Sequence, residues 1–215
     1  MAIGMARDAA FEAHHRRYED WFERHEAAYV SELLALRAFV PREGDGLEIG
    51  VGSGRFAGPL GVQVGVDPSP AMLHYAAKRG IEVVEGVGEA LPFAADRFDH
   101  VLLVTTICFL DSPATMVAEA RRVLRPGGRL VIGFIDRDSP LGQVYATHRH
   151  ESVFYLEASF HSAEEVAAML DDGGFRVDAW GQTLSHSPER MREIEPLRSG
   201  CGQCAFVVVS AINEG

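Results

Sequence analysis

Three glycines at alternate positions are the residues of this sequence that point most directly to chemistry. Gly50, Gly52 and Gly54 lie in the stretch LEIGVGSGRF (47–56), directly after a short apolar run. Glycine adopts a positive φ without strain and lets another group approach the backbone closely. This stretch therefore predicts a tight turn after a strand, with a ligand resting against bare peptide.

Two carboxylates accompany the glycines. Glu48 comes just before the turn, and Asp67 ends a second apolar run, VQVGVD (62–67). We expect Glu48 to accept a hydrogen bond from an ammonium group, directly or through water, and the two oxygens of Asp67 to accept from both hydroxyls of a ribose. The apolar flanks favour this over solvated surface carboxylates. An adenosine ligand that also carries an amino-acid ammonium would satisfy both residues.

Two other nucleotide motifs fit the glycines less well. A phosphate-cradling P-loop needs G-x-x-x-x-G-K-[ST], and no lysine is near. In the dinucleotide fingerprint G-x-G-x-x-G, the third glycine would fall at Arg55 if the motif begins at Gly50, and at Ala57 if it begins at Gly52. The second register is a weak match that leaves Glu48 unexplained, so an NAD-dependent oxidoreductase stays an alternative.

The elements that must position these residues alternate between strands and helices. Strands are expected at 46–50, 62–67, 81–86, 98–106, 129–135, 176–182 and 204–212, with helices at 70–80, 112–128 and 162–175. Such alternation requires crossover connections, and hence an α/β fold with a doubly wound, mostly parallel seven-stranded sheet. Ligands of such sheets bind outside the carboxyl ends of the strands, where the glycine stretch falls.

Four motifs in this order resemble the class I S-adenosylmethionine-dependent methyltransferases, in the branch of small-molecule enzymes called type 11. The motifs are LEIGVGSGRF, VGVDPSPAML, GEALPFAADRFDHV and EARRVLRPGGRLVI, spread over residues 47 to 135. The resemblance implies a Rossmann-like methyltransferase fold and the cofactor S-adenosyl-L-methionine, with S-adenosyl-L-homocysteine as its product. One departure is Val87, which stands where the family usually has an acidic residue near the adenine.

The resemblance also implies a set of cofactor-binding residues. Tyr18 is expected near the methionine end, Thr105 near the sulfonium, and Glu89 and Ala90 beside the adenine. The full set expected from the motifs and the resemblance together is Tyr18, Trp21, Glu48, Gly50, Gly52, Gly54, Asp67, Pro68, Met72, Gly88, Glu89, Ala90 and Thr105.

Two flanking segments are expected to act on the substrate side. Residues 1–40 read as a helical arm, broken once, whose aromatic stripe Tyr18, Trp21, Phe22 and Tyr29 packs either as core or as a lid over the cofactor. The domain proper is expected over residues 41–215, with a substrate-side insertion at 136–160. The three histidines of the arm, among them His25, are expected to be solvated.

Methyl transfer by in-line displacement mainly needs the reacting atoms to be aligned. A general base is required only when the acceptor keeps its proton near neutral pH. The weak candidates for that role are Tyr145, His148 and His150. The two histidines lack a metal-site spacing, so we expect no metal. The CxxC at 201–204 lacks a second pair, which argues against structural zinc.

The bulk composition restricts the partners. A chain of 215 residues favours one domain, and its net charge of −11 argues against binding nucleic acid. No long apolar run indicates a leader or a membrane span. We therefore expect a cytoplasmic enzyme, monomer or homodimer, that methylates a small molecule. A non-catalytic module that binds S-adenosylmethionine or its product is the other alternative.

Overall fold

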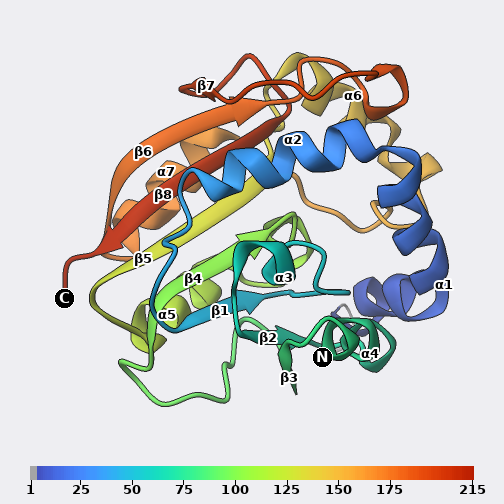
Figure 1. Cartoon of the computed structure of the whole chain (residues 1–215). Coiled ribbons are helices and arrows are strands. Elements are labelled where there is room, and N and C mark those ends of the chain that lie inside the picture. The colour runs from blue at the N-terminus through green and yellow to red at the C-terminus, as the bar shows by residue number, and fades with distance from the viewer. Residues whose placement is uncertain (1–3) are drawn as a thin grey trace.

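The computed structural model describes residues 4–215, and residues 1–3 of the expected arm lie outside the described residues. An eight-stranded sheet with the order β3-β2-β1-β4-β5-β8-β6-β7 runs through it (Figure 1). The strands are β1 (Gly46–Ile49), β2 (Val64–Asp67), β3 (Glu82–Glu85), β4 (Phe98–Val104), β5 (Leu124–Ile135), β6 (Phe175–Thr183), β7 (Arg198–Ser199) and β8 (Phe206–Asn213).

The sheet is parallel on the side of the glycine turn. β1 pairs in parallel with β2 and β4, and β4 pairs in parallel with β5, whereas β8 runs antiparallel between β5 and β6. The expected doubly wound methyltransferase fold is therefore confirmed. The expected count of seven strands is one short, because the two residues of β7 add a strand at the edge of β6.

Helices cover both faces of the sheet. They are α1 (Gly4–Arg24), α2 (Glu26–Arg37), α3 (Ala57–Leu60), α4 (Pro70–Lys78), α5 (Pro113–Val123), α6 (Pro140–His148) and α7 (Ala163–Asp172), with short 3-10 turns η1 (Ile107–Phe109), η2 (Arg149–Glu151) and η3 (Pro188–Arg190).

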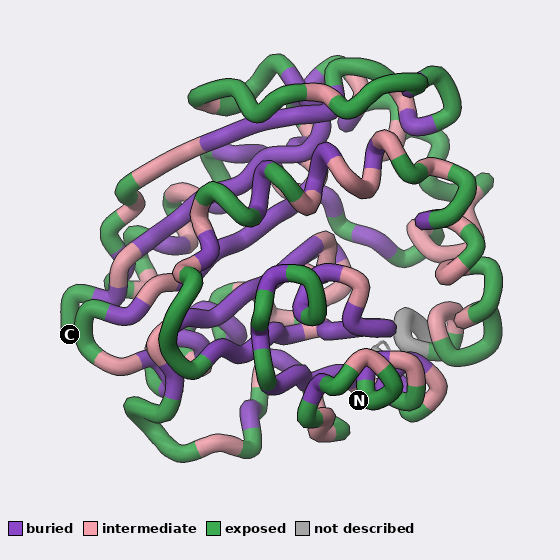
Figure 2. The backbone as a smooth tube through the Cα atoms, viewed as in Figure 1, coloured by how far each residue is buried: buried purple, intermediate pink, exposed green. Residues whose placement is uncertain are grey.

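Side chains that alternate along a strand divide the core in two. Leu103 and Ile132 pack with residues of α5 and α7, whereas Leu102 and Val131 pack with residues of α2, α3 and α4. The central strands are buried on both faces, as Figure 2 shows for the purple tube of β1. A sheet buried on both faces holds the turn after β1 on a rigid base.

Local signals explain where most helices begin. Ser69 accepts a hydrogen bond from the N–H of Met72 at the start of α4, and Ser162 forms a capping box with Glu165 at the start of α7. The helix expected over 112–128 ends earlier, at Val123. Leu124 has an extended backbone and begins β5, since the following Pro-Gly-Gly turn cannot continue a helix.

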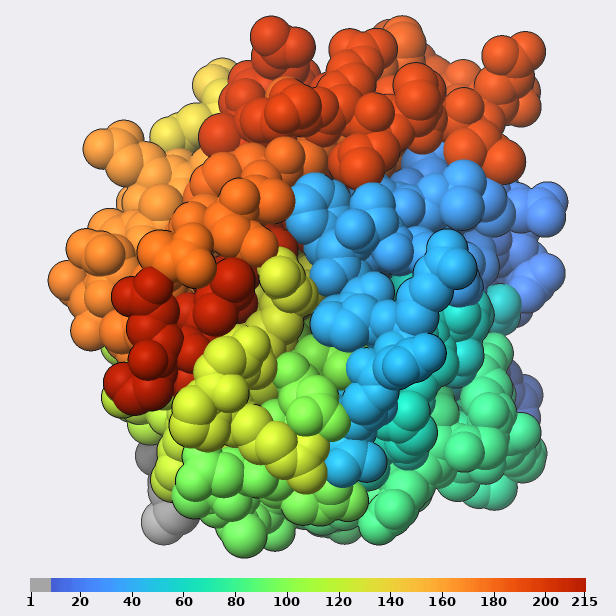
Figure 3. Space-filling view, turned by 60° about the vertical axis from the view of Figure 1, so that its left-hand side comes forward, coloured from blue at the N-terminus to red at the C-terminus, as the bar shows by residue number. Residues whose placement is uncertain are grey.

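The expected N-terminal helix is broken between α1 and α2. His25 has non-helical backbone angles at this break, and α1 is kinked at His14. Beyond the break, α2 packs against the carboxyl-terminal part of the chain, and Figure 3 shows its blue residues beside the orange and red ones. The hydroxyl of Ser31 accepts a hydrogen bond of 2.8 Å from the N–H of Glu195 there.

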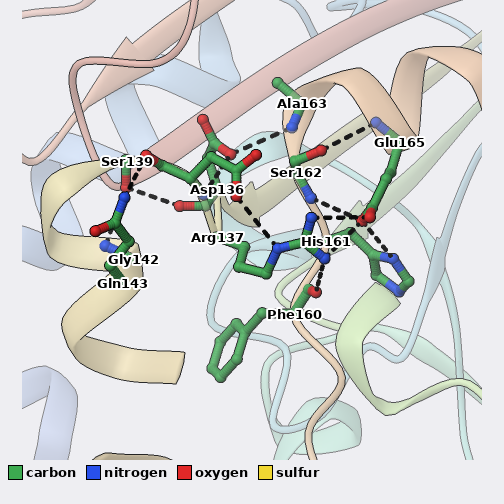
Figure 4. Close-up of polar contacts among 11 residues, drawn as sticks. Asp136, Arg137, Ser139, Gly142, Gln143, Phe160, His161, Ser162, Ala163 and Glu165 are labelled. Carbon is green, nitrogen blue, oxygen red and sulfur yellow. Dashed lines mark hydrogen bonds and ion pairs between the residues drawn. The ribbon is translucent and has the colours of Figure 1, made fainter. Parts of the chain in front are cut away.

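Both ends of the segment 136–160 are fixed to the core around Asp136 (Figure 4). The Asp136 carboxylate accepts from the N–H of Ala163, and its carbonyl accepts from the hydroxyl of Ser139 at 2.7 Å. Arg137 pairs with Glu165 at 2.8 Å. The segment begins where β5 ends and returns to the start of α7, so α6 and η2 lie beside the carboxyl ends of the parallel strands.

Candidate functional site

A cavity of about 580 Å³ lies at the carboxyl end of β1 and is lined by Gly50 and Gly52. Both glycines have a positive φ, +68° and +51°, as the sequence predicts for this turn. A Cβ on Gly52 would point to the side chains of Met72 and Tyr18, at 3.4 and 3.6 Å. The bare peptide of Gly52 therefore widens the cavity at this position.

Gly54 has a different position from the other two glycines. It does not line the cavity, and a Cβ placed on it would lie 3.1 Å from the Cα of Ala76 in α4. Its missing side chain therefore lets α4 pack closely against the turn.

Asp67 points back at the glycine turn. Its two carboxylate oxygens accept from the N–H groups of Gly52 at 2.8 Å and Ser69 at 2.9 Å. The side chain is buried and lines the cavity, followed by Pro68, Ser69 and Met72. A carboxylate oxygen can accept from more than one donor, so this side chain can also accept from a ligand hydroxyl.

Glu48 is fully buried behind the turn. The N–H of Ala57 at the start of α3 is a hydrogen-bond donor to its carboxyl, but Oε2 has no partner among the described residues. Burial raises the pKa of Glu48 well above its ordinary value. Glu48 does not itself line the cavity, so a ligand group would reach it only through an intervening water or a small shift of the turn.

The loop after β3 borders the cavity with Gly86, Val87, Gly88 and Glu89, whereas Ala90 is exposed and does not line it. The Glu89 carboxylate accepts from the N–H groups of Asp111 at 2.9 Å and Ser112 at 3.2 Å. It thereby ties this loop to the start of α5.

Two threonines follow β4. Thr105 lines the cavity with a φ of +49°, uncommon for a residue with a Cβ, and its N–H donates to the carbonyl of Gly133 at 2.7 Å. Backbone strain of this kind is frequent at functional sites. Thr106, which the sequence did not single out, also lines the cavity, and its hydroxyl donates to the carbonyl of Val104.

Aromatic side chains from three parts of the chain meet over the cavity. The ring of Phe154, from the segment 136–160, lies 5.1 Å from Phe11 and 6.1 Å from Tyr18 of α1. Phe11 also contacts Phe109 of η1, at 5.1 Å. Trp21 lines the same cavity. These contacts join α1 to η1 and to the segment 136–160.

The ring of Phe22 is buried in the core, and the hydroxyl of Tyr29 donates to the carbonyl of Arg55 at 2.6 Å. The aromatic stripe of the arm is thus divided. Tyr18, Trp21 and the buried Phe22 line the cavity, whereas Tyr29 does not.

The three candidate bases are separated by the fold. Tyr145 and His148 of α6 line the cavity, and the ring N–H at Nδ1 of His148 is in reach of the carbonyl of Val144 at 3.0 Å. His150 does not line it and lies beside Glu151 on the surface. Burial raises the pKa of Tyr145 well above its ordinary value, so this phenol keeps its proton at neutral pH.

Glu32 and His25 are cavity residues that the sequence reasoning missed. Glu32 of α2 is 5% exposed and lines the cavity. A carboxylate inside the apolar run VSELLALR was the available signal, since charged residues are seldom buried without a purpose. His25 was expected to be solvated, but its side chain is only 13% exposed, because the break between the helices turns it toward the cavity.

No helix among residues 4–215 is both long and apolar enough to cross a bilayer, and no group of three potential metal ligands occurs among the described side chains. Cys108, Cys201 and Cys204 are unbridged.

Residues 47–132 match the family model for a methyltransferase domain. A crystal structure of a methyltransferase from Thermotoga maritima superposes with a TM-score of 0.93 at 44% identity, covering 96% of this chain and 99% of that one. That protein is described as S-adenosylmethionine-dependent and as a possible histamine N-methyltransferase. An uncharacterized protein of Methanocaldococcus jannaschii is 43% identical over 201 residues, which cover 94% of this chain and 97% of the relative.

The chain belongs to this family of S-adenosylmethionine-dependent methyltransferases and is an enzyme with S-adenosyl-L-methionine as its cofactor. The residues present fit that cofactor. Gly52 leaves a cradle that a Cβ would narrow, Asp67 faces the cavity, and the unpartnered Oε2 of Glu48 lies behind the turn.

Proposed function

We propose that this enzyme methylates a small molecule inside the cavity that α1 and the segment 136–160 enclose. The observation that carries the proposal is the aromatic contact of Phe154 with Phe11 and Tyr18, which joins α1 to the segment 136–160 among the residues that line the cavity. A cavity of about 580 Å³ beneath such a cover suits a compact acceptor beside the cofactor better than a loop of protein or nucleic acid.

The cofactor roles follow from position. Asp67 accepts from the ribose hydroxyls, and Glu48 attracts the amino-acid ammonium through water. The peptide of Gly52 makes room for the ligand, and Gly50 lines the cavity where its missing side chain makes room for Thr106. Gly88 and Glu89 border the adenine, and Thr105 lies beside the sulfonium. Gly54 and Ala90 support this site from outside the cavity.

The cofactor, when bound, supplies an already activated methyl group on a positively charged sulfur. The chain's own contribution is to hold the acceptor in line and to exclude water, which contributes up to roughly 7–11 kcal/mol in favourable systems. Tyr18 and Trp21 cover the reacting region as parts of a lid, and the arm of residues 1–40 and the insertion of residues 136–160 are the two substrate-side segments. His148 is exposed at the rim, where it could take a proton only from an acceptor that reaches it.

Two relatives support a small acceptor. The Thermotoga maritima protein is described as a possible histamine N-methyltransferase. A ubiquinone/menaquinone biosynthesis C-methyltransferase of Paracoccus denitrificans is 34% identical over 116 residues, 45% of this chain. Histamine is therefore a sensible first acceptor to test.

Composition supports the remaining parts of the proposal. The net charge of −11 disfavours a nucleic-acid substrate. We place the enzyme in the cytoplasm, as a monomer or homodimer. The non-catalytic alternative would leave no acceptor space, whereas this cavity continues past the glycine turn to Tyr145 and Leu184.

A methyl-transfer assay tests the proposal. Protein and methyl-labelled cofactor are incubated with pooled metabolites, histamine among them, and also with total cell protein and RNA. We expect label in the fraction below about 1 kDa, a size consistent with pockets for small ligands. Label confined to protein or RNA, or no label in any fraction, contradicts a small-molecule acceptor.

A further inference from the structure

We infer that Glu32 forms a subsite that recognises a positively charged amine on the methyl acceptor; this inference rests on the proposed function. Glu32 lies on α2 and lines the same cavity as Ile135, Tyr145 and Leu184, and its charge acts on the phenol of Tyr145. No cofactor role is assigned to these four residues, so the part of the cavity that they line, the Glu32 half, is the space for an acceptor.

The protein leaves this carboxyl without a counter-charge. Glu32 is 5% exposed, and among residues 9–215, whose side chains the structure describes, it has neither a hydrogen bond nor an ion pair. Loss of solvent alone raises its pKa to about 8, and no neighbouring cation opposes that rise. A buried carboxylate is costly unless it is paired, so a ligand cation at this point would be stabilised strongly.

The surroundings suit an amine in particular. The charge of Glu32 raises the pKa of Tyr18, Tyr145 and Tyr155, which places all three rings in its electrostatic neighbourhood. The faces of aromatic rings attract ammonium groups, and a cation beside Glu32 favours its ionised form, whereas an anion would disfavour it. The negative net charge of the protein also favours the approach of cations. The chemical class is therefore an amine, protonated or quaternary, on an aromatic or apolar body.

Paired probes test the subsite. Calorimetry compares benzylamine with benzyl alcohol, and phenethylamine with 2-phenylethanol, on protein saturated with S-adenosylhomocysteine. We expect the amine of each pair to bind at least tenfold more tightly to the wild type. Glu32→Gln keeps the shape but removes the charge, so the preference should fall below twofold. Equal binding of amine and alcohol by the wild type, absence of amine binding, or an undiminished preference in E32Q would overturn the inference.

A matched control uses the same helix. Glu26 is exposed on the first turn of α2 and does not line the cavity, so Glu26→Gln should keep the full preference. Unchanged affinity of E32Q for S-adenosylhomocysteine shows that this variant is folded.

The transfer assay separates this inference from the proposed function. Label on acceptors from a cationic pool supports both. Label only on neutral or anionic small molecules overturns the subsite and leaves the small-molecule function standing. Label only on macromolecules overturns the proposed function and the inference with it.

Discussion

At the scale of single residues, three buried carboxyl groups lie in or behind the cavity: Asp67 and Glu32 line it, and Glu48 lies behind the turn. Asp67 already accepts two backbone N–H groups, so its position is fixed before a ligand arrives. Glu48 and Glu32 are buried without full partners, and burial raises the pKa of both. Fixed Asp67 suits shape recognition of a sugar, whereas the two unpaired carboxyls suit groups that bring positive charge.

Asp67→Ala should weaken S-adenosylhomocysteine binding at least tenfold, which corresponds to about 1.4 kcal/mol. The variant removes the acceptor of the ribose hydroxyls and frees the N–H groups of Gly52 and Ser69. Calorimetric titration measures the loss. Glu82→Gln, on the exposed edge strand β3, is the control and should bind like the wild type. Unchanged affinity in Asp67→Ala would refute the ribose role.

Glu32 should make stability depend on pH. Its pKa is 4.5 in an unfolded chain and about 8 when folded. Between these values the folded protein keeps a proton that the unfolded chain has lost. Stability is therefore fully present below pH 4.5 and is lost as the pH rises through about 8, by up to about 1.4 kcal/mol per pH unit.

The measurement is urea unfolding of wild type and Glu32→Gln between pH 5 and pH 8.5, without ligand. Other titrating groups cancel in the difference between the two proteins. We expect the wild type to lose stability relative to E32Q across this window. Parallel stability curves would show that Glu32 is ionised in the folded state.

The residues of the cofactor half could be predicted because glycine spacing and strand-end acids are local signals. Glu32 could not be placed, since its meaning depends on which face of α2 meets the cavity. Gly54 shows the same limit, because only the packing of α4 reveals that it serves a helix.

At the scale of elements, α1 is attached directly to the cofactor site. Glu19 pairs with Arg55 at 2.9 Å and Arg79 at 2.7 Å, and its side chain is mostly buried. Glu12 accepts from the N–H of Ala71 at the start of α4 at 3.0 Å. These contacts fasten α1 to the residues beside the glycine turn, so we expect them to slow the release of a bound cofactor.

Glu19→Gln should loosen α1 and release S-adenosylhomocysteine several-fold faster, because Arg55 and Arg79 lose a partly buried partner. Stopped-flow dissociation and hydrogen exchange of α1 amides measure the two effects. The control is Glu23→Gln: Glu23 also pairs with Arg55 at 2.9 Å but is 72% exposed, so its loss should change dissociation less than twofold. If E19Q and E23Q release S-adenosylhomocysteine at the same rate, the Glu19 contacts of α1 do not control cofactor release.

The existence of most elements could be predicted from apolar periodicity, but their ends could not. The helix before β5 ends at Val123 because Leu124 pairs with Phe98 of β4 as part of the sheet. The two residues of β7 are too few to show a periodic pattern. They form a strand because they pair with the edge of β6.

At the scale of the whole molecule, two cores hold a single sheet, and the cavity lies where the carboxyl ends of β1, β2 and β4 meet the two substrate-side segments. The crossover rules were enough to predict this location from sequence. These rules could not predict the aromatic contacts, since Phe11, Phe109 and Phe154 are far apart in the chain and meet only in the folded protein.

Ligand binding should stabilise the whole fold. S-adenosylhomocysteine at 100 times its dissociation constant should add about 2.7 kcal/mol. For a chain of this size that is a rise of roughly 5–10 °C in the unfolding midpoint. Differential scanning calorimetry measures it, and NAD at the same concentration should give no shift. An equal shift with NAD would favour a dinucleotide site.

The most direct test of one cavity for both cofactor and acceptor is a crystal structure with S-adenosylhomocysteine. We predict the ribose hydroxyls at Asp67, the sulfur beside Thr105, and open space from the sulfur to Glu32 and Tyr145. A sulfur that faces solvent, or a ligand that fills the Glu32 half itself, would contradict the account.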